Sequence, residues 1–361
     1  MRIAYVINSV EGGGAALPIP AIMEVLRDGG ADVKIFALTR RDGRAIPAIV
    51  EAGLDLAVRE GGESDHLAAL HWLETAISGW RPTHIWTSLT RATLLGQRVG
   101  RRLGIPVVSW QHAAYLKPAN LALLRWQRRL SRLWIADSHS VAQLTVRRLH
   151  VPETRLALWP LFAADPGAPR GRPWQAGQPI RLGSLGRLHP VKGYDVLIAA
   201  LAKLKTGGFE SPSSYEVVIA GEGMERAALD AALKAANLPT VTFAGFVDKP
   251  RAFLAGLHLY VQPSRSEGLC IAAHEAMQAG LGVVASHVGE LPFSIEPGRT
   301  GAVVPPGDAD ALADALAKLL ANPQNLYSIG LRSRRNVLDR FGKEMFVARG
   351  QAIVERLKQS T

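Results

Sequence analysis

The chain alternates strand-like and helix-like runs, and this alternation stops once near the middle and then starts again. Short apolar runs such as Ile3 to Ile7 and Val33 to Leu38 predict buried strands, and helical patterns separate them. Strands that alternate with helices are typical of a parallel sheet covered by helices on both faces. We therefore predict an α/β protein built from Rossmann-like, doubly wound parallel sheets.

The interruption lies between Pro160 and Pro179, where proline and glycine are frequent, and we interpret it as a linker. A length of 361 residues also favours two domains over one. Two doubly wound domains joined by a hinge are expected to bind a ligand in the cleft between them. The predicted parts are an N-terminal domain at 1–163, a C-terminal domain at 164–340, and a last helix at 341–361 that packs back on the first domain.

Basic residues are concentrated in the first half of the chain. The net charge is +11, and residues 81–163 hold 13 Lys and Arg against two acidic residues, Asp137 and Glu153. A local excess of one sign indicates either an anionic partner or a solubilising face.

The sequence also predicts an intracellular setting. Cys270 is the only cysteine, so an internal disulfide is excluded and a reducing cytoplasm is the natural compartment. The N-terminal apolar run is too short for a signal peptide, and no stretch approaches the roughly 18 apolar residues of a membrane span. We expect a cytoplasmic protein.

The segment from Ser264 to Gly280 carries two carboxylates, Glu267 before an expected helix and Glu275 inside it. An uninterrupted helix would separate their backbones by roughly 12 Å. Hydrolytic pairs in glycosidases need about 5–9.5 Å, so a hydrolytic dyad is disfavoured. The pair suits two contacts on an extended ligand, with a diphosphate held between them by the amides of Gly268, Leu269 and Cys270 at the helix start. The alternative is a helix-terminal carboxylate plus an exposed helical Glu.

Two cations follow the first strand expected in the second half. Arg187 and Lys192 stand five residues apart in a loop that contains glycine and proline. A guanidinium fork and an ammonium point charge together suit a diphosphate and offset charge that develops on a leaving phosphate. Taken alone, both would be ordinary surface cations.

These segments, in order, resemble glycosyltransferase family 4, a group of retaining enzymes with the GT-B fold. The matching features are strongest over residues 180–322 and weak over 40–105. They are the Gly12–Gly14 loop, His112, Gly186-Arg187, Lys192-Gly193, Ala220 to Gly223, Phe243 to Val247, Glu267 to Glu275, and the Pro305 to Ala313 segment.

The resemblance implies a role for each matching residue. Arg187 and Lys192 would hold the donor diphosphate, Glu267 the donor sugar, and Glu275 the ribose. Phe246 and Val247 would meet the base through their backbone, Gly13 and Gly14 would let the first domain approach the diphosphate, and His112 would lie beside the transferred sugar. The implied activity is metal-independent transfer of a hexose from a nucleotide sugar, with UDP preferred over GDP, to a lipid-linked or polysaccharide acceptor. No cofactor is expected, because the nucleotide sugar is a substrate.

The sequence departs from the family at two places. Leu158 to Phe162 stands where the family commonly has Pro-Asn-Gly, and Cys270 stands where a small residue is frequent. The diverged region at 40–105 leaves the acceptor unassigned.

Residues 121–135 read as an amphipathic helix with arginines on one face and leucine and tryptophan on another. Such a helix suits the surface of an anionic membrane, here the inner face, and the alternative is a packed helix with its arginines in water. The residues of the basic face are Arg125, Arg128, Arg129 and Arg132, and those of the apolar face are Leu123, Trp126, Leu130 and Leu133.

Other classes of protein fit less well. A nicotinamide dehydrogenase would need a third glycine where Leu17 stands. A zinc hydrolase would need a second histidine at Gln278. The basic helix expected at residues 121–135 is not accompanied by a nucleic-acid recognition module, so no nucleic-acid partner is expected. A non-catalytic sugar-binding protein or a nucleotide-sugar epimerase on a similar fold remains the alternative.

Overall fold

The computed structural model describes residues 1–113 and 115–359, and the chain divides into two compact units. The first unit comprises Met1–Phe162 together with the C-terminal segment from Glu344 onward, and the second comprises Ala163–Lys343. The two units are described separately below. Compared with the sequence-based boundaries, the last helix joins the first unit from Glu344 instead of residue 341.

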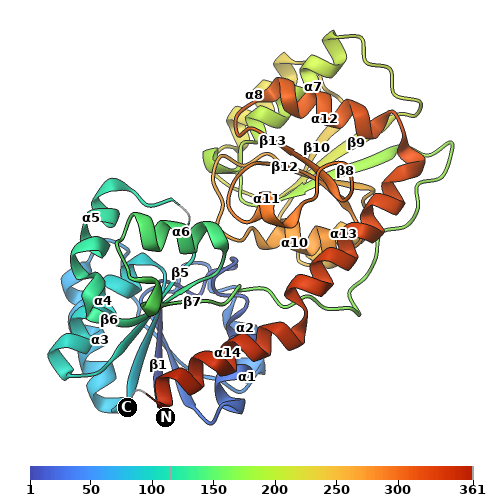
Figure 1. Ribbon diagram of the computed structural model, residues 1–361. Helices are drawn as coiled ribbons and strands as arrows, with labels where there is room; N and C mark the ends of the chain where they lie inside the picture. The colour runs from blue at the N-terminus through green and yellow to red at the C-terminus, as the bar shows by residue number, and fades with distance from the viewer. Residues whose placement is uncertain (114, 360–361) are drawn as a thin grey trace. The chain divides into compact units, whose positions relative to one another are not determined.

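The first unit holds a parallel sheet of seven strands in the order β3-β2-β1-β4-β5-β6-β7. In Figure 1, α3 and α4 lie on one face of this sheet, and α1, α2 and α14 lie on the other. Its strands are β1 (Arg2–Ile7), β2 (Asp32–Ala37), β3 (Asp55–Val58), β4 (His84–Ser88), β5 (Val107–Gln111), β6 (Ser131–Ala136) and β7 (Leu156–Leu158). Its helices are α1 (Ile19–Asp28), α2 (Ile46–Glu51), α3 (His66–Trp80), α4 (Thr90–Leu103), α5 (Pro118–Gln127), α6 (His139–Arg147) and α14 (Lys343–Lys358).

The second unit repeats the plan with six parallel strands in the order β10-β9-β8-β11-β12-β13. Helices α7, α8 and α12 cover one face of this sheet, and α10 and α13 cover the other (Figure 1). Its strands are β8 (Ile180–Leu185), β9 (Tyr215–Ala220), β10 (Val241–Gly245), β11 (Leu259–Gln262), β12 (Gly282–Ser286) and β13 (Gly301–Val304). Its helices are α7 (Tyr194–Thr206), α8 (Arg226–Ala235), α9 (Pro250–Ala255), α10 (Ile271–Gln278), α11 (Leu291–Ser294), α12 (Ala309–Leu320) and α13 (Leu326–Phe341).

Both sheets therefore have the strand order of a Rossmann fold, which confirms the predicted doubly wound architecture. In each sheet the order reverses beside the first strand, between β1 and β4 and between β8 and β11. Ligands of open α/β sheets bind outside the carboxyl ends of the strands at such a reversal. The loops that leave β1, β4, β8 and β11 are therefore the places where functional side chains are expected.

Tryptophan rings hold the C-terminal helix on the first unit. Trp110 stacks on Trp159 with ring centroids 4.7 Å apart, and Trp159 in turn lies 5.2 Å from the ring of Phe346 in α14. Gly350 faces the same cluster, because a side chain at that position would come within 2.4 Å of Trp159. These rings are fully or almost fully buried, so α14 is part of the core of the first unit.

The amphipathic helix predicted for residues 121–135 is wrong. Helix α5 ends at Gln127, a 3-10 turn occupies Arg128–Leu130, and the chain continues as β6 from Ser131. Arg132 and Leu133 are therefore strand residues, and Leu133 pairs with Val108 of β5. Hydrogen bonding within the sheet overrides the helical spacing of the side chains.

Candidate active site

The second unit brings most of the predicted residues to the carboxyl ends of β8 and β11. Arg187 and Lys192 lie in the loop after β8, and Glu267 lies in the loop after β11. The two strands are neighbours in the sheet. Side chains that are 75 positions or more apart in the sequence therefore meet at the reversal of strand order.

The loop after β8 is held by the backbone of a second loop. The amide of Gly186 donates to the carbonyl of Ala220, and the amide of Leu188 donates to the carbonyl of Glu222, each at 2.9 Å. A side chain at Gly221 would lie 1.9 Å from the Gly186 carbonyl oxygen, and one at Gly223 would lie 2.3 Å from that of Leu188. The two glycines in the Ala220 to Gly223 motif thus allow the close contact that supports the cationic loop.

Lys192 and Glu267 form an ion pair, with Nζ and Oε1 2.8 Å apart. Their side chains are 21% and 9% exposed. Burial opposes the charge on Lys192, but the neighbouring Glu267 carboxylate outweighs it, so the pKa of Lys192 lies above its ordinary value. The sequence assigned Lys192 to phosphate and Glu267 to sugar; the structure adds that the lysine stays charged and contacts the carboxylate directly.

Arg187 is exposed and has no hydrogen bond or ion pair with any residue in the described ranges. Its guanidinium keeps all of its donors available for a ligand. The unpaired guanidinium of Arg187, in the same loop as the paired ammonium of Lys192, suits an anion with two phosphates.

The helix after Glu267 begins later than the sequence suggested. Helix α10 starts at Ile271, and Cys270 precedes it in the left-handed conformation, with φ 63°. The 12 Å estimate for the separation of Glu267 and Glu275 assumed an uninterrupted helix and does not apply. Among the described residues, the amides of Gly268, Leu269 and Cys270 have no acceptor, so they remain available as anion donors.

Glu275 lies in α10, and its carboxylate makes no hydrogen bond with a residue in the described ranges. Burial raises its pKa above the ordinary 4.5, and the charge of Arg251 partly opposes this shift. The sequence alternative of an exposed helical Glu is therefore wrong.

Phe246 and Val247 follow β10, where Phe246 is 42% exposed, so the second unit presents an aromatic ring near the edge of its sheet.

In the first unit, His112 follows β5, and a polar side chain lies next to each of its two ring nitrogens. Its Nε2 is hydrogen-bonded to Ser88 Oγ at 2.8 Å, and its Nδ1 lies 3.4 Å from Asp137 Oδ2. Ser88 ends β4 and Asp137 follows β6. The ring therefore sits at the carboxyl ends of three adjacent strands, and its neighbours determine its orientation.

The glycine loop after β1 is anchored by the loop after β2. The amide of Gly12 donates to Asp42 Oδ1 at 2.9 Å, and the side chain of Arg44 lies against the α-carbon of Gly12. Gly13 and Gly14 follow, half-buried and exposed respectively. His112 and these glycines belong to the first unit and the other predicted residues to the second.

Sequence reasoning missed several side chains that hold the predicted ones. Ser88 and Asp137 orient His112, and Tyr260, Gln262 and Ser264 surround Glu267. A signal for the second set was present, because alternate positions of a strand point to the same face. Tyr260 and Gln262 occupy alternate positions of β11, and Ser264 continues the alternation just after the strand, which indicated a polar face at its end.

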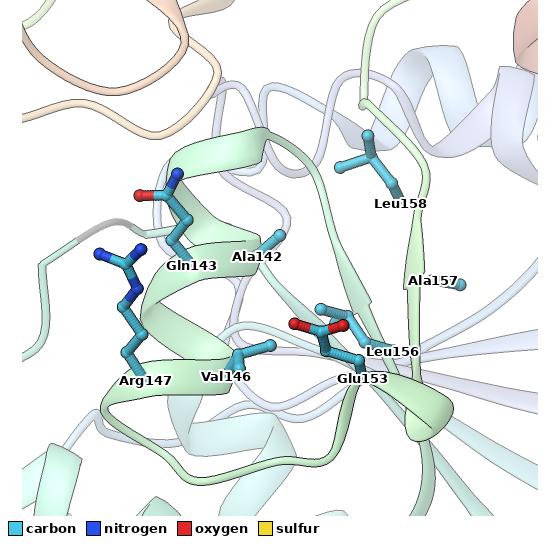
Figure 2. A pocket seen from close by; sticks show the side chains of 8 residues that line it. All are labelled: Ala142, Gln143, Val146, Arg147, Glu153, Leu156, Ala157 and Leu158. Atoms are coloured by element: carbon cyan, nitrogen blue, oxygen red, sulfur yellow. The ribbon is translucent and has the colours of Figure 1, made fainter.

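A separate hollow of about 390 Å³ lies between α6 and β7 of the first unit (Figure 2). Val146 of α6 and Leu156 and Leu158 of β7 line it, with Arg147 and Glu153 beside them. None of the residues that line it is a site residue predicted from the sequence.

Two kinds of feature, a metal-binding cluster and a membrane-spanning helix, are absent from the described residues. Residues 1–113 and 115–359 contain no cluster of three or more His, Cys, Asp or Glu side chains that could hold a metal ion. Over the same ranges, no helix is both long and apolar enough to span a membrane.

Two protein families match the chain, one in each half. The family described as "Glycosyltransferase Family 4" matches residues 12–163, and "Glycosyl transferases group 1" matches residues 179–322.

Curated relatives agree with these matches. The chain is 28% identical to the lipopolysaccharide core biosynthesis mannosyltransferase LpcC of Rhizobium leguminosarum bv. viciae, over 86% of this chain and 90% of the relative. It is 27% identical to a GDP-mannose-dependent alpha-mannosyltransferase of Mycobacterium tuberculosis, over 68% of this chain and 65% of the relative.

Among solved structures, Anabaena Alr3699/HepE in complex with UDP-glucose superposes with a TM-score of 0.82 at 20% identity, covering 99% of this chain and 100% of the other. At this identity the likeness shows the fold alone. The two sheets and this likeness define a GT-B fold. The chain belongs to glycosyltransferase family 4. This assignment replaces the dehydrogenase, zinc-hydrolase and nucleic-acid-binding alternatives.

Proposed function

We propose that this glycosyltransferase moves a hexose from a nucleoside diphosphate to a saccharide or lipid-linked acceptor, with retention of configuration and without a metal ion. The observation that carries the proposal is the group formed by Arg187, the Lys192–Glu267 pair and the amides of residues 268–270. It places cations and N–H donors for two phosphates next to a carboxylate for sugar hydroxyls, at the reversal of strand order.

The proposed chemistry is a front-face displacement. The bond between the anomeric carbon and the β-phosphate oxygen breaks, and the acceptor oxygen bonds to the same face of that carbon. The acceptor proton passes to the departing phosphate. Arg187 and Lys192 stabilise the negative charge that develops on this phosphate, and the protein contributes positioning more than proton transfer.

The base of the donor can be identified by comparing a GDP-sugar directly with a UDP-sugar. The family resemblance of the sequence implies UDP. Two relatives named above are mannosyltransferases, and one of them is named as GDP-mannose-dependent. These names shift our proposal for the hexose and nucleotide towards GDP-mannose, with UDP-glucose as the competing donor.

The test uses the full chain with GDP-mannose and UDP-glucose labelled in the sugar and a panel of lipid-linked and saccharide acceptors. Transfer of label with an α-configured product, in the presence of EDTA, supports the proposal. Inversion of configuration contradicts the mechanism, and loss of transfer on adding EDTA contradicts metal independence. Failure of every nucleotide sugar to bind contradicts the function itself.

We also propose that α5 brings the first unit to an anionic membrane, on the cytoplasmic side. Although the helix is shorter than predicted, Leu123 and Trp126 in it are 41% and 70% exposed. Exposed arginines lie on the same helix, on the turn that follows it and on α4, which packs against α5, and each cation near an anionic surface contributes about 1 kcal/mol to binding. These arginines are Arg98 and Arg101 of α4, Arg125 of α5 and Arg129 of the following turn.

Sedimentation with vesicles checks this surface. The chain is expected to bind vesicles of phosphatidylglycerol and not of phosphatidylcholine, and Trp126→Ala combined with Arg129→Ala should weaken the binding. Leu67→Ala is the control, because Leu67 is 81% exposed on α3 of the same unit. Equal binding to both vesicle types would remove the membrane proposal and leave the transferase intact.

A further inference from the structure

One oxygen of the Glu267 carboxylate receives three donors. Oε1 accepts from Lys192 Nζ at 2.8 Å, from Ser264 Oγ at 2.6 Å and from Gln262 Nε2 at 3.2 Å. The Cys270 thiol also contacts the carboxylate. No nitrogen or oxygen donor in the described part of the chain is bonded to Oε2. The carboxylate is thus held through one oxygen.

Gln262 is itself held in one orientation. Its amide oxygen accepts from the Tyr260 hydroxyl at 2.8 Å, so its NH₂ group must face Glu267. Tyr260 in turn accepts from the backbone amide of Leu185 at 3.1 Å. Leu185 directly precedes Gly186 and Arg187, so this chain of hydrogen bonds connects the end of β8 to the carboxylate.

The side chains in this chain are sealed from solvent. Tyr260, Gln262 and Ser264 are all fully buried. A buried and fully bonded polar network of this kind fixes the geometry of its members. A carboxylate can accept about four hydrogen bonds, so the capacity that remains lies mainly on Oε2.

We propose that Gln262, oriented by Tyr260, is a positioning residue that fixes Glu267 with Oε2 directed to the hydroxyls of the donor hexose. The inference rests on the proposed function and deepens it, because it assigns Gln262 to the sugar and not to the nucleotide. Gln262 does not touch the donor in this scheme; it acts through Glu267.

The first test removes the amide with Gln262→Leu. Loss of a hydrogen bond to a charged group is expected to weaken binding of GDP-mannose or UDP-glucose about ten-fold, while GDP and UDP bind as before. The kcat for transfer should fall by about the same factor, since a misaligned carboxylate no longer positions the sugar. Titration calorimetry and initial rates give the two readouts.

The matched control is Gln278→Leu. Gln278 is another buried glutamine of the second unit, 1% exposed, and its side chain accepts from the backbone amide of Asp165 at 2.7 Å. This variant should lose stability and keep the wild-type ratio of nucleotide-sugar affinity to nucleotide affinity. A matching loss of this ratio in both variants would assign Gln262 a merely structural role.

A second variant, Gln262→Glu, gives a pH signature. It places a carboxyl group within about 3 Å of Glu267, and two such groups cannot both ionise easily. While it is protonated, the new group can still donate to Glu267 and accept from Tyr260. The kcat should therefore approach the wild-type value at low pH and fall as the pH rises and the shared proton is lost. The titratable groups that face this position are Lys192, Glu267, Cys270, Tyr194 and Tyr260.

The outcomes separate the inference from the proposed function. An unchanged affinity ratio in Gln262→Leu, or no recovery of Gln262→Glu at low pH, overturns the role of Gln262. If the affinity ratio changes in Gln262→Leu but the wild-type chain transfers no sugar, the role of Gln262 stands and the transferase mechanism is overturned. Failure of the wild-type chain to bind either nucleotide overturns both.

Discussion

Ser88 Oγ lies 2.8 Å from Nε2 of His112, and Asp137 Oδ2 lies 3.4 Å from the other ring nitrogen. This Ser–His–Asp order is that of a hydrolase triad, but Ser88 is fully buried and its hydroxyl cannot meet a substrate. The serine and the carboxylate instead fix the imidazole at the end of β5. A ring held on both sides can contact a ligand in only one orientation.

Ser88→Ala should therefore lower kcat about ten-fold with little change in nucleotide affinity, because the ring loses one of its two restraints. Steady-state kinetics with the preferred donor measure this change. Ser109→Ala is the control, since Ser109 is equally buried in β5 and is bonded to Ser131 instead of His112. Equal losses in both variants would argue against an orienting role for Ser88.

Donor binding should depend on the ionisation of Glu275. Its pKa is raised by burial, so the carboxylate takes up its proton at a higher pH than an exposed glutamate does. The ionised form offers both oxygens as charged acceptors to the ribose hydroxyls, whereas protonation turns one of them into a donor. Affinity should fall as the pH falls through this raised pKa.

Calorimetry with a nucleotide sugar across pH 5–8 tests this dependence, and a nucleotide sugar avoids the terminal phosphate that titrates in free UDP or GDP. Glu275→Gln should bind about ten-fold more weakly and lose the pH dependence. Parallel pH profiles for the two proteins would remove Glu275 from the ribose contact.

Gly350→Ala should destabilise the first unit by about 1–3 kcal/mol. The added methyl group would lie 2.4 Å from Trp159 and 2.5 Å from Val25, inside a packed core. Urea unfolding followed by tryptophan fluorescence reports on this cluster directly. Gly79→Ala in α3 meets no atom within 4 Å, so it should raise stability by about 0.5–1 kcal/mol.

The free energy of unfolding should fall at acidic pH because of His274. Burial lowers its pKa from 6.5 to about 4, although the Cys270 carbonyl and nearby Glu290 oppose this shift. The unfolded chain therefore binds more protons than the folded chain between these values, and the stability that is present above pH 6.5 is lost progressively towards pH 4.

The full effect of that shift is about 3 kcal/mol. Urea unfolding at several pH values should show it in the wild type and not in His274→Gln. If the free energy of unfolding depends on pH with the same slope in both proteins, this dependence originates in other groups.

Much of the fold could be predicted from the sequence where the local signal is strong. Strands β4, β8, β9 and β12 begin and end where the apolar runs do. Asp308 is a residue type that caps helices, and α12 starts directly after it, where the Asp308 side chain accepts from the amide of Ala311 at 2.9 Å.

Other elements depend on partners that the sequence does not reveal. Strands β3, β7 and β13 have three or four residues each and were not predicted. Two of them, β3 and β7, are edge strands of the first sheet, and β13 is an edge strand of the second. Their conformation is set by pairing with a neighbour more than by their own composition. The same pairing turns residues 131–136 into a strand.

The candidate site shows the same division. Residue types and spacing indicated Arg187, Lys192 and Glu267, because few side chains suit phosphate and sugar. Among the three donors to one oxygen of Glu267, Lys192 reaches it because β11 lies beside β8. No spacing along the chain indicates that contact.

The chain passes from the first unit to the second after Phe162 and returns to the first after Lys343. This order has a consequence for synthesis on the ribosome. The second unit is one continuous stretch, whereas the first needs Phe346 and Gly350 to enclose Trp159. Domains usually mature in the order in which they emerge. Here the first unit is completed only after the second unit has been translated, because residues of α14 enclose its tryptophans.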